Sequence, residues 1–254
     1  MKTIVVMPMY NEVGNIRPMA GALMALDVPG LSLLVVDDNS PDGTAAAVDE
    51  LGREYPGRVS LLRRAGKQGL GTAYKAGFHR ALADGAEVVV QMDADFSHSP
   101  QDVPRLVGAL AAHDVAIGSR YARGGSLDES WGAGRHLLSW WANAVYTRLI
   151  LGTRQRDTTS GFRAWRRDTL QGLNLERIRS NSYDFMVEMT YVAERLGYRV
   201  VELPIHFSAR EAGESKMGLA HMLQSALCVW RIRAWHRALT PAERHKGALP
   251  SAAR

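Results

Sequence analysis

The amino-acid sequence predicts an α/β fold with a mostly parallel central sheet that helices cover on both faces. Two observations support this prediction. Short apolar runs alternate with helix-patterned segments through the first half of the chain, which is typical of parallel strands joined by helices. The chain also has 254 residues, of which 46% are hydrophobic, and this suits one sizeable domain.

Five strands are expected in the first half, because five short runs are rich in aliphatic and β-branched residues. They are TIVVMP (3–8), LSLLVVDD (31–38), RVSLLRR (58–64), AEVVVQMD (86–93) and DVAIGSR (114–120). Four helices are expected between these strands, where apolar residues recur at helical spacing. Their ranges are 12–26, 43–55, 69–85 and 100–113.

The second half of the chain is less regular. Residues 134–152 and 182–198 have the periodicity of helices, and 157–167 is expected to be a loop followed by a strand. Residues 199–210 are expected to form a further strand that leads into the polar segment REAGESKMG (210–218). We expect these strands to extend the first sheet and not to form a second domain.

The net charge of +5 is concentrated near the C-terminus. Residues 208–254 hold eight of the 31 Lys/Arg and three of the 26 Asp/Glu, so the rest of the chain is neutral. A solvated basic tail and a surface for an anionic partner, such as a lipid membrane or a nucleic acid, both fit this distribution. The single cysteine, Cys228, rules out an internal disulfide and fits a reducing compartment. We expect no signal peptide in the N-terminal run MKTIVVMPMYNE.

No stretch of the sequence reaches the roughly 18 uninterrupted apolar residues that a membrane-spanning helix needs. The segment MGLAHMLQSALCVW (217–230) is shorter, and Trp230, Trp235 and several basic residues lie at its far end. This composition suits a helix that lies in a membrane interface. A helix buried in the domain fits equally well.

Polar residues gather where the predicted strands end. The carboxyl ends of parallel strands meet at one edge of a sheet, where α/β proteins bind ligands. Tyr10 and Glu12 follow the first strand, the run DDNSPDG (37–43) the second, GKQGLGT (66–72) the third, Asp93 and Asp95 the fourth, and Arg120 the fifth. We therefore expect the functional site at this edge.

Several common α/β chemistries are excluded by the same loops. The first strand is not followed by the G-x-G-x-x-G of a dinucleotide site, and Gly66-Lys67 lacks the preceding glycines of a phosphate loop. The chain has no G-x-S-x-G nucleophile elbow and no zinc-ligand spacing. The remaining feature is the acidic pair Asp93 and Asp95. Two carboxylates so close together favour a hard divalent cation, Mg²⁺ or Mn²⁺, shared with substrate phosphates, although ordinary turn formation also uses aspartate.

Seven motifs together resemble a known family. MPMYNE, VVDDNSPDGT, KQGLGTAYKAGF, MDADFSHSP, GSRY, DTTSGFR and SAREAGESKMG occur in this order over roughly residues 3–220. The set is similar to that of the dolichyl- or polyprenyl-phosphate mannose synthases, which are family 2 glycosyltransferases with the GT-A fold. The resemblance implies inverting transfer of mannose from GDP-mannose to a polyprenyl or dolichyl phosphate, with Mg²⁺ or Mn²⁺.

The resemblance also implies roles for individual residues. Pro8, Tyr10, Glu12 and Asp38 match positions that hold the guanosine, and Asp93, Ala94 and Asp95 match the metal and diphosphate positions. Ser97 stands where some members have a glutamine as a further metal contact. Arg120, Arg135 and Ser139 match the acceptor-phosphate positions, and Arg210 and Lys216 a loop that closes on the donor diphosphate. Asp157 is expected to position the acceptor or the sugar, and Asp95, Arg120 and Asp157 are the expected catalytic residues.

The implied reaction needs no catalytic base, because a phosphate monoester with a second pKa of about 6 is already largely dianionic at neutral pH. We expect in-line attack of a phosphate oxygen on the sugar, with the metal and the cationic loop stabilising the departing GDP. Three alternatives are a polyprenyl-phosphate glucosyltransferase that uses UDP-glucose, a sugar-phosphate nucleotidyltransferase, and a non-catalytic nucleotide-sugar binder.

The expected organisation is one GT-A domain over residues 1–240, in which 208–238 supplies the donor-closing loop and the interfacial helix, and a flexible basic tail over 241–254. HLLSWWANAVY (136–146) is a second amphipathic candidate. The implied partners are the nucleotide sugar, the lipid phosphate and a membrane surface, with no nucleic acid. We expect a cytoplasmic protein bound peripherally to the inner face of the membrane, where a separate membrane protein could anchor it.

Overall fold

A computed structural model of the chain describes residues 1–128, 134, 139–208 and 219–245, and for 219–226 it describes the backbone alone. Arg135, Arg210 and Lys216, to which the sequence assigns phosphate contacts, lie outside the described residues. The predictions for these three side chains therefore remain predictions.

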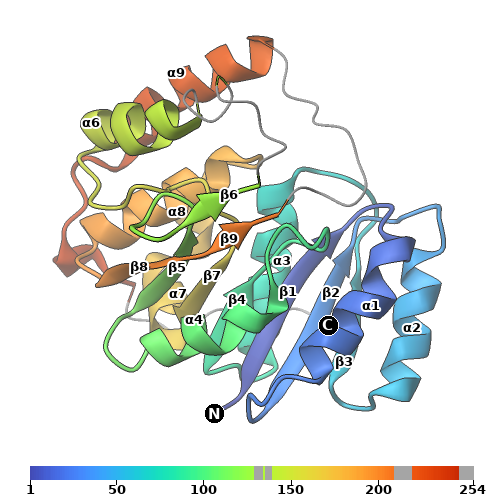
Figure 1. The fold of residues 1–254 in the computed structure, drawn as a ribbon. Coiled ribbons are helices and arrows are strands. Elements are labelled where there is room, and N and C mark those ends of the chain that lie inside the picture. The colour runs from blue at the N-terminus through green and yellow to red at the C-terminus, as the bar shows by residue number, and fades with distance from the viewer. Residues whose placement is uncertain (129–133, 135–138, 209–218, 246–254) are drawn as a thin grey trace.

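The core of the fold is a seven-stranded sheet with the strand order β3-β2-β1-β4-β7-β5-β8 (Figure 1). The strands are β1 (Thr3–Met9), β2 (Leu31–Asp37), β3 (Val59–Arg63), β4 (Val88–Gln91), β5 (Val115–Ser119), β7 (Arg163–Arg166) and β8 (Val200–Pro204). All neighbours pair in parallel except β7, which runs antiparallel between β4 and β5. The predicted mostly parallel sheet, with its extension by the second half of the chain, is confirmed.

Helices cover both faces of the sheet, as predicted. One hydrophobic cluster joins the sheet to α1 (Val13–Met24), α2 (Thr44–Glu54) and α4 (Val103–Ala109), which follows the short η1 (Pro100–Asp102). A second cluster, on the other face, joins the sheet to α3 (Leu70–Ala83), α7 (Arg167–Leu173) and α8 (Asp184–Arg195). The short η3 (Leu175–Arg177) connects α7 to α8. Burial on both sides favours strands that are almost entirely apolar, such as β1, in which only Thr3 is polar.

A third cluster attaches the two helices that the sequence assigned to the membrane interface. The π-helix η2 (Trp141–Thr147) continues into α6 (Arg148–Leu151), and α9 (Leu219–His236) packs on both α6 and α8 (Figure 1). Cys228, Val229 and Ile232 are buried there, while Leu227 and Trp230 on the same helix are exposed. The part of α9 from Leu227 onward therefore combines a buried face with an exposed apolar one. In the part of the chain that the structure describes, no helix has the length and apolar character needed to span a membrane.

The strand predicted over 199–210 divides in two. β8 ends at Pro204, and the chain then crosses to a separate two-stranded parallel sheet, in which β9 (His206–Phe207) pairs with β6 (Ser126–Leu127). The proline has no N–H for a further ladder bond, and the next amide, Ile205 N–H, donates to Ser119 O at 3.1 Å. This crossing brings β9 beside the end of β5.

The predicted boundary between domain and tail at residue 240 is wrong. Residues Pro241–Glu243 form the short helix η4, which Thr240 and Glu243 cap reciprocally. Arg244 donates to the main-chain oxygens of Leu196 (2.7 Å) and Gly197 (2.8 Å). These bonds satisfy carbonyls at the end of α8, so the folded domain extends through residue 245. Residues 246–254 lie outside the described part of the chain.

Candidate active site

Three strand ends at the carboxyl edge share an unusual backbone feature. Asn11, Asn39 and Phe96 each follow a predicted site residue and each has a left-handed conformation, with φ of 62°, 61° and 58°. Asparagine tolerates this conformation, but phenylalanine does so only under strain. Strained residues that the surrounding structure holds in place cluster at functional sites, so Phe96 supports the assignment of the turn between Asp95 and Ser97 as functional.

Asp93 follows the end of β4 and lies between α3 and the loop before β7. Its Oδ1 accepts a hydrogen bond of 3.0 Å from the Tyr74 hydroxyl, and its Oδ2 lies 3.8 Å from His98 Nδ1. A Cβ atom added to Gly161 would lie only 3.0 Å from Asp93 Oδ2, so a side chain at this position would press on the carboxylate. Burial, and then the Asp93 carboxylate, raise the pKa of Tyr74 well above its usual value, which keeps the hydroxyl protonated as a donor.

Asp95 is held by a local turn. Its Oδ1 accepts hydrogen bonds from the main-chain N–H of Ser97 (3.1 Å) and from the Ser97 hydroxyl (2.5 Å). Ser97 is fully buried. The sequence predicts Ser97 as a metal contact, and in the structure its hydroxyl orients the Asp95 carboxylate.

The donor set around Asp93 and Asp95 fits a hard divalent cation. Carboxylate oxygens are the ligands that Mg²⁺ and Mn²⁺ prefer, and such ions usually complete their shell with substrate phosphates and water. The described residues contain no cluster of three or more His, Cys, Asp or Glu side chains arranged around a metal position. His98 Nδ1 is buried beside the pair without a hydrogen-bond partner in the described structure.

The second strand end brings Asp38 against an arginine that the sequence did not single out. Arg64 Nη1 lies 2.8 Å from Asp38 Oδ1, and Arg64 Nη2 donates to Thr72 Oγ1 at 2.7 Å. Burial, aided by the neighbouring Asp37, raises the pKa of Asp38 despite the lowering effect of Arg64. Arg64 directly follows β3 and carries no motif of its own, so only the parallel pairing of β2 with β3 reveals it.

The remaining predicted guanosine residues line the same end of the sheet. Pro8 lies within β1, paired with Val36 of β2. Tyr10 is exposed, and Lys67 Nζ lies 4.7 Å from the centre of its ring. Glu12 Oε2 accepts a hydrogen bond of 2.7 Å from Asn15 Nδ2. An exposed aromatic ring beside a lysine, with the half-buried Glu12 carboxylate at the same sheet edge, can stack on and hydrogen-bond to a flat heterocycle.

Arg120 and Asp157, predicted separately, form one buried ion pair. Arg120 Nε donates to Asp157 Oδ2 at 2.8 Å and Nη2 donates to Oδ1 at 2.7 Å, while Nη2 also donates to Thr159 Oγ1 at 2.7 Å. Asp157 is fully buried, and the Arg120 side chain is 10% exposed. Burial alone would raise the pKa of Asp157, but the paired Arg120 outweighs it and lowers the pKa. The pairing with Arg120 thus favours the ionised form of the Asp157 carboxylate.

The predicted acceptor residue Ser139 lies beside this ion pair. Its hydroxyl is 2.6 Å from the Tyr121 hydroxyl, and Tyr121 is the residue next to Arg120. The Arg120 guanidinium also lies 5.2 Å from the ring centre of Phe207 in β9. The cation thus contacts the rings of Tyr121 and Phe207, the Thr159 hydroxyl and its own carboxylate partner, a setting suited to a phosphate.

Two glutamates hold the main chain of the segment 153–157, which is called the clamped segment below. Glu194 accepts from the main-chain N–H of Arg154 at 3.0 Å, and Glu202 accepts from the N–H groups of Arg156 (2.9 Å) and Asp157 (2.8 Å). Side chains alternate along this segment, so that Thr153, Gln155 and Asp157 are buried while Arg154 and Arg156 are exposed.

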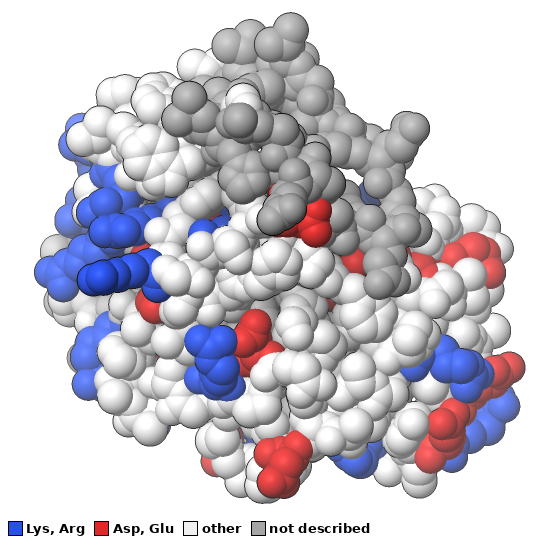
Figure 2. Space-filling model, viewed as in Figure 1, with Lys and Arg blue, Asp and Glu red and all other residues white. Residues whose placement is uncertain are grey.

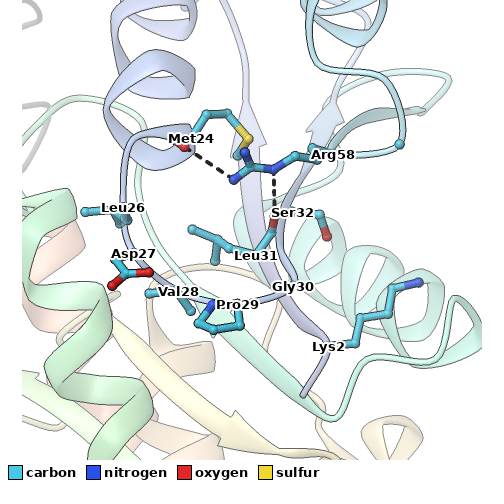
Figure 3. Close-up of a pocket in the computed structure, with 11 residues that line it drawn as sticks. Lys2, Met24, Leu26, Asp27, Val28, Pro29, Gly30, Leu31, Ser32 and Arg58 are labelled. Carbon is cyan, nitrogen blue, oxygen red and sulfur yellow. Dashed lines mark hydrogen bonds between the residues drawn. The ribbon is translucent and has the colours of Figure 1, made fainter.

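A cavity of about 530 Å³ lies at the opposite edge of the sheet, near the starts of β1, β2 and β3 (Figure 3). Arg58 is one of the charged residues that line it, and its guanidinium donates to the main-chain oxygens of Leu31 and Met24, both at 3.3 Å (Figure 3). The arginine is therefore already used in joining the end of α1 to the start of β2. The predicted site residues lie at the other edge, so this cavity is not part of the candidate site.

Comparison with known proteins agrees with the family that the motifs resemble. The model of glycosyl transferase family 2 matches residues 4–173. An undecaprenyl-phosphate mannosyltransferase from Micrococcus luteus is 45% identical over 217 residues, covering 85% of this chain and 88% of the relative. A polyprenol monophosphomannose synthase from Mycolicibacterium smegmatis is 43% identical over 235 residues, covering 91% and 88%.

A solved structure supports the fold independently. Glucosyl-3-phosphoglycerate synthase from Mycobacterium tuberculosis, crystallised with Mn²⁺, UDP-glucose and phosphoglyceric acid, superposes with a TM-score of 0.61 at 18% identity. The match covers 92% of this chain and 79% of that one. The predicted GT-A fold is confirmed by this likeness and by the family match. The chain is a glycosyltransferase that belongs to glycosyl transferase family 2.

Proposed function

We propose that this enzyme transfers mannose, with inversion, from GDP-mannose to a polyprenyl monophosphate and releases GDP. The observation that carries the proposal is that the segment 157–161 touches two chemically different half-sites. The acidic half-site is Asp93 with Asp95, and the arginine half-site is Arg120 with Asp157. At one end of this segment Asp157 holds Arg120, and at the other end Gly161 contacts the Asp93 carboxylate. The names of the two bacterial relatives describe mannose transfer to polyprenyl phosphates, which supports this reaction among those of the family.

The acidic half-site is suited to the donor diphosphate. Asp93 and Asp95 would hold a Mg²⁺ or Mn²⁺ ion, which supplies the positive charge that makes a nucleoside diphosphate a good leaving group. Tyr74 and Ser97 orient the two carboxylates through their hydroxyl groups. The Mn²⁺ in a structural neighbour is consistent with such an ion. We propose that Pro8, Tyr10, Glu12 and Asp38 surround the nucleoside.

The arginine half-site is suited to the lipid phosphate. The carboxylate of Asp157 fixes the orientation of Arg120, and Thr159 and Ser139 offer hydroxyl groups beside it. A phosphate oxygen that is already ionised can attack the sugar without a base, which agrees with an Asp157 whose pKa is lowered by its arginine. We assign Asp157 the role of orienting Arg120. Arg135, Arg210 and Lys216 would add further cationic contacts.

A lipid acceptor requires access to a membrane, and the exposed surface around α6 and α9 is suited to that. Leu149 is 77% exposed and Trp230 is 55% exposed, and Trp140 and Trp141 add two more exposed rings. Figure 2 shows Lys and Arg side chains gathered on the side of the molecule where α6 and α9 lie in Figure 1. Arg148 belongs to α6, and Arg154 and Arg156 follow it on the exposed side of the clamped segment.

We propose peripheral binding of this surface to anionic headgroups, which attract each nearby basic residue by about 1 kcal/mol. Co-sedimentation with vesicles of anionic phospholipid at low salt should show binding that weakens as salt is added, because part of it is electrostatic. The double variant Arg154→Glu with Arg156→Glu should bind less, whereas Arg53→Glu on α2 should bind as the unmodified chain does. Equal binding to neutral and anionic vesicles would count against the electrostatic part.

The reaction itself is tested by incubating the enzyme with radiolabelled GDP-mannose, polyprenyl phosphate and Mn²⁺ or Mg²⁺ and counting label in the organic phase. We expect label from GDP-mannose and little from UDP-glucose. Transfer from UDP-glucose alone would replace the proposal by the glucosyltransferase alternative, and the absence of transfer from both donors would reject both.

A further inference from the structure

Arg163, the first residue of β7, is a buried charged side chain that the proposed reaction does not use. It is fully buried, and within the described residues it forms no ion pair with a carboxylate. Its guanidinium donates to three main-chain oxygens, from Nε to Ser160 (2.8 Å), from Nη1 to Met186 (2.8 Å) and from Nη2 to Thr158 (2.6 Å). Burial lowers the pKa of Arg163 to about 10, which leaves it charged at neutral pH. Burying such a charge costs free energy, so a buried arginine at this position indicates a specific structural role.

The positions of its three partners show that role. Two of the carbonyls belong to the segment 157–161, and the third belongs to α8. This segment begins at Asp157, which grips Arg120, and ends at Gly161, which lies against the Asp93 carboxylate. Arg163 therefore fastens, to a helix of the core, the piece of main chain that touches both half-sites.

The antiparallel direction of β7 places a second arginine where it can serve as a control. Arg163 begins β7 at the edge that carries the candidate site, whereas Arg167 directly follows the opposite end of the strand. Arg167 Nη1 also donates to main-chain oxygens, those of Leu82 (2.9 Å) and Ala86 (3.0 Å). The two arginines thus make the same kind of bond at opposite edges of the sheet.

We infer that Arg163 is a positioning residue, which sets the spacing between the Asp93 carboxylate and the Arg120 guanidinium by fixing the main chain of Thr158 and Ser160. Its structural role is independent of the substrates, and its effect on turnover rests on the proposed function. The Arg163 side chain binds main-chain oxygens near both ends of the segment 157–161. A substitution of Arg163 should therefore weaken the binding of the cation and of the acceptor together.

The test compares Arg163→Lys with Arg167→Lys. Lysine keeps the charge but cannot reproduce the planar fork that reaches three oxygens. For Arg163→Lys we expect the dissociation constant for Mn²⁺, measured by calorimetry without substrates, to rise about tenfold, and the KM for polyprenyl phosphate to rise about tenfold, as expected for the loss of charged hydrogen bonds. For Arg167→Lys both constants should stay within about twofold of the unmodified value, even if the melting temperature falls.

Equal binding constants in Arg163→Lys and Arg167→Lys, with a change in melting temperature alone, would overturn the inference. A measurement on the unmodified protein covers the case in which Arg163→Lys does not fold. The Nε–H resonance of Arg163 should shift on adding MgCl₂ and again on adding inorganic phosphate, and the absence of either shift would contradict the positioning role. Weaker Mn²⁺ binding in Arg163→Lys without any mannose transfer by the unmodified enzyme would reject the proposed function and retain this inference.

Discussion

Asp93 and Asp157 stand at the two half-sites, and their surroundings differ in the source of positive charge. The Asp93 side chain is 35% exposed and accepts a hydrogen bond from the neutral Tyr74 hydroxyl. Asp157 is fully buried and already carries its cation, Arg120, in a two-point ion pair. A carboxylate that still needs a cation is suited to recruit one, whereas a carboxylate that is already paired can only orient its partner. The difference supports our proposal that the metal binds at the first half-site and the acceptor phosphate at the second.

The largest expected effect is on turnover when the acidic half-site loses charge. Asp93→Asn or Asp95→Asn should lower kcat by about two to three orders of magnitude, the scale of removing one group that stabilises transition-state charge. Steady-state assays across a range of Mn²⁺ concentrations measure this change. Thermal stability should change little, because the asparagine amide has the shape of the carboxylate and its oxygen can still accept the hydrogen bond from Tyr74 or Ser97. Full activity in excess EDTA would contradict the role of a cation here.

The second expected effect is on stability when the arginine half-site loses charge. Asp157→Asn leaves the buried Arg120 cation unpaired, and breaking a buried pair in this way costs about 3–5 kcal/mol. Urea unfolding of Asp157→Asn, with Asp93→Asn as the control, measures the difference in the free energy of unfolding. If Asp157→Asn were as stable as Asp93→Asn, the contrast between the half-sites would be wrong.

The same contrast predicts a pH dependence. The pKa of Asp157 in the folded chain lies below its ordinary value, because Arg120 outweighs the effect of burial. The ion pair therefore stabilises the fold fully above the unfolded pKa of about 3.9, and this contribution is lost as the pH falls through the folded value. Urea midpoints measured below about pH 4 should fall more steeply for the unmodified chain than for Asp157→Asn. Parallel curves would show that Asp157 does not contribute to acid unfolding.

The smallest expected effects come from two tyrosine hydroxyls, one in each half-site. Tyr74→Phe removes the hydrogen bond to Asp93 and should weaken Mn²⁺ binding about threefold, consistent with one neutral donor of about 0.5–1.5 kcal/mol. Tyr121→Phe removes the contact with Ser139 and should raise the KM for the acceptor by a similar factor while leaving Mn²⁺ binding unchanged. Calorimetry and acceptor titrations on both variants give the four constants. A Tyr121→Phe variant with weakened Mn²⁺ binding would mean that the half-sites are not separable.

The acidic half-site was predictable from the sequence, and the arginine half-site was predictable only in part. Asp93 and Asp95 directly follow an apolar strand, so local pattern places them at the sheet edge. The pairing of Arg120 with Asp157 joins residues 37 positions apart and depends on the antiparallel insertion of β7 beside β5. No periodicity in the chain specifies that insertion.

Other features were missed for similar physical reasons. Arg64 looks like the end of a strand, and only the neighbouring strand brings it to Asp38. The strain at Phe96 cannot be inferred from a residue type that avoids positive φ. A flexible basic tail was expected to begin at residue 241, whereas Arg244 finds its acceptors at the end of α8.

Two-substrate kinetics of Arg120→Lys test most directly the central claim, that the arginine half-site receives the lipid phosphate while the acidic half-site receives the donor. Lysine keeps the charge and can still pair with Asp157, but it loses the two-point geometry that suits a phosphate. The KM for polyprenyl phosphate should rise about tenfold or more, the usual scale for a charged hydrogen bond, and the KM for GDP-mannose should stay within about twofold. A raised KM for GDP-mannose with an unchanged KM for polyprenyl phosphate would contradict the claim.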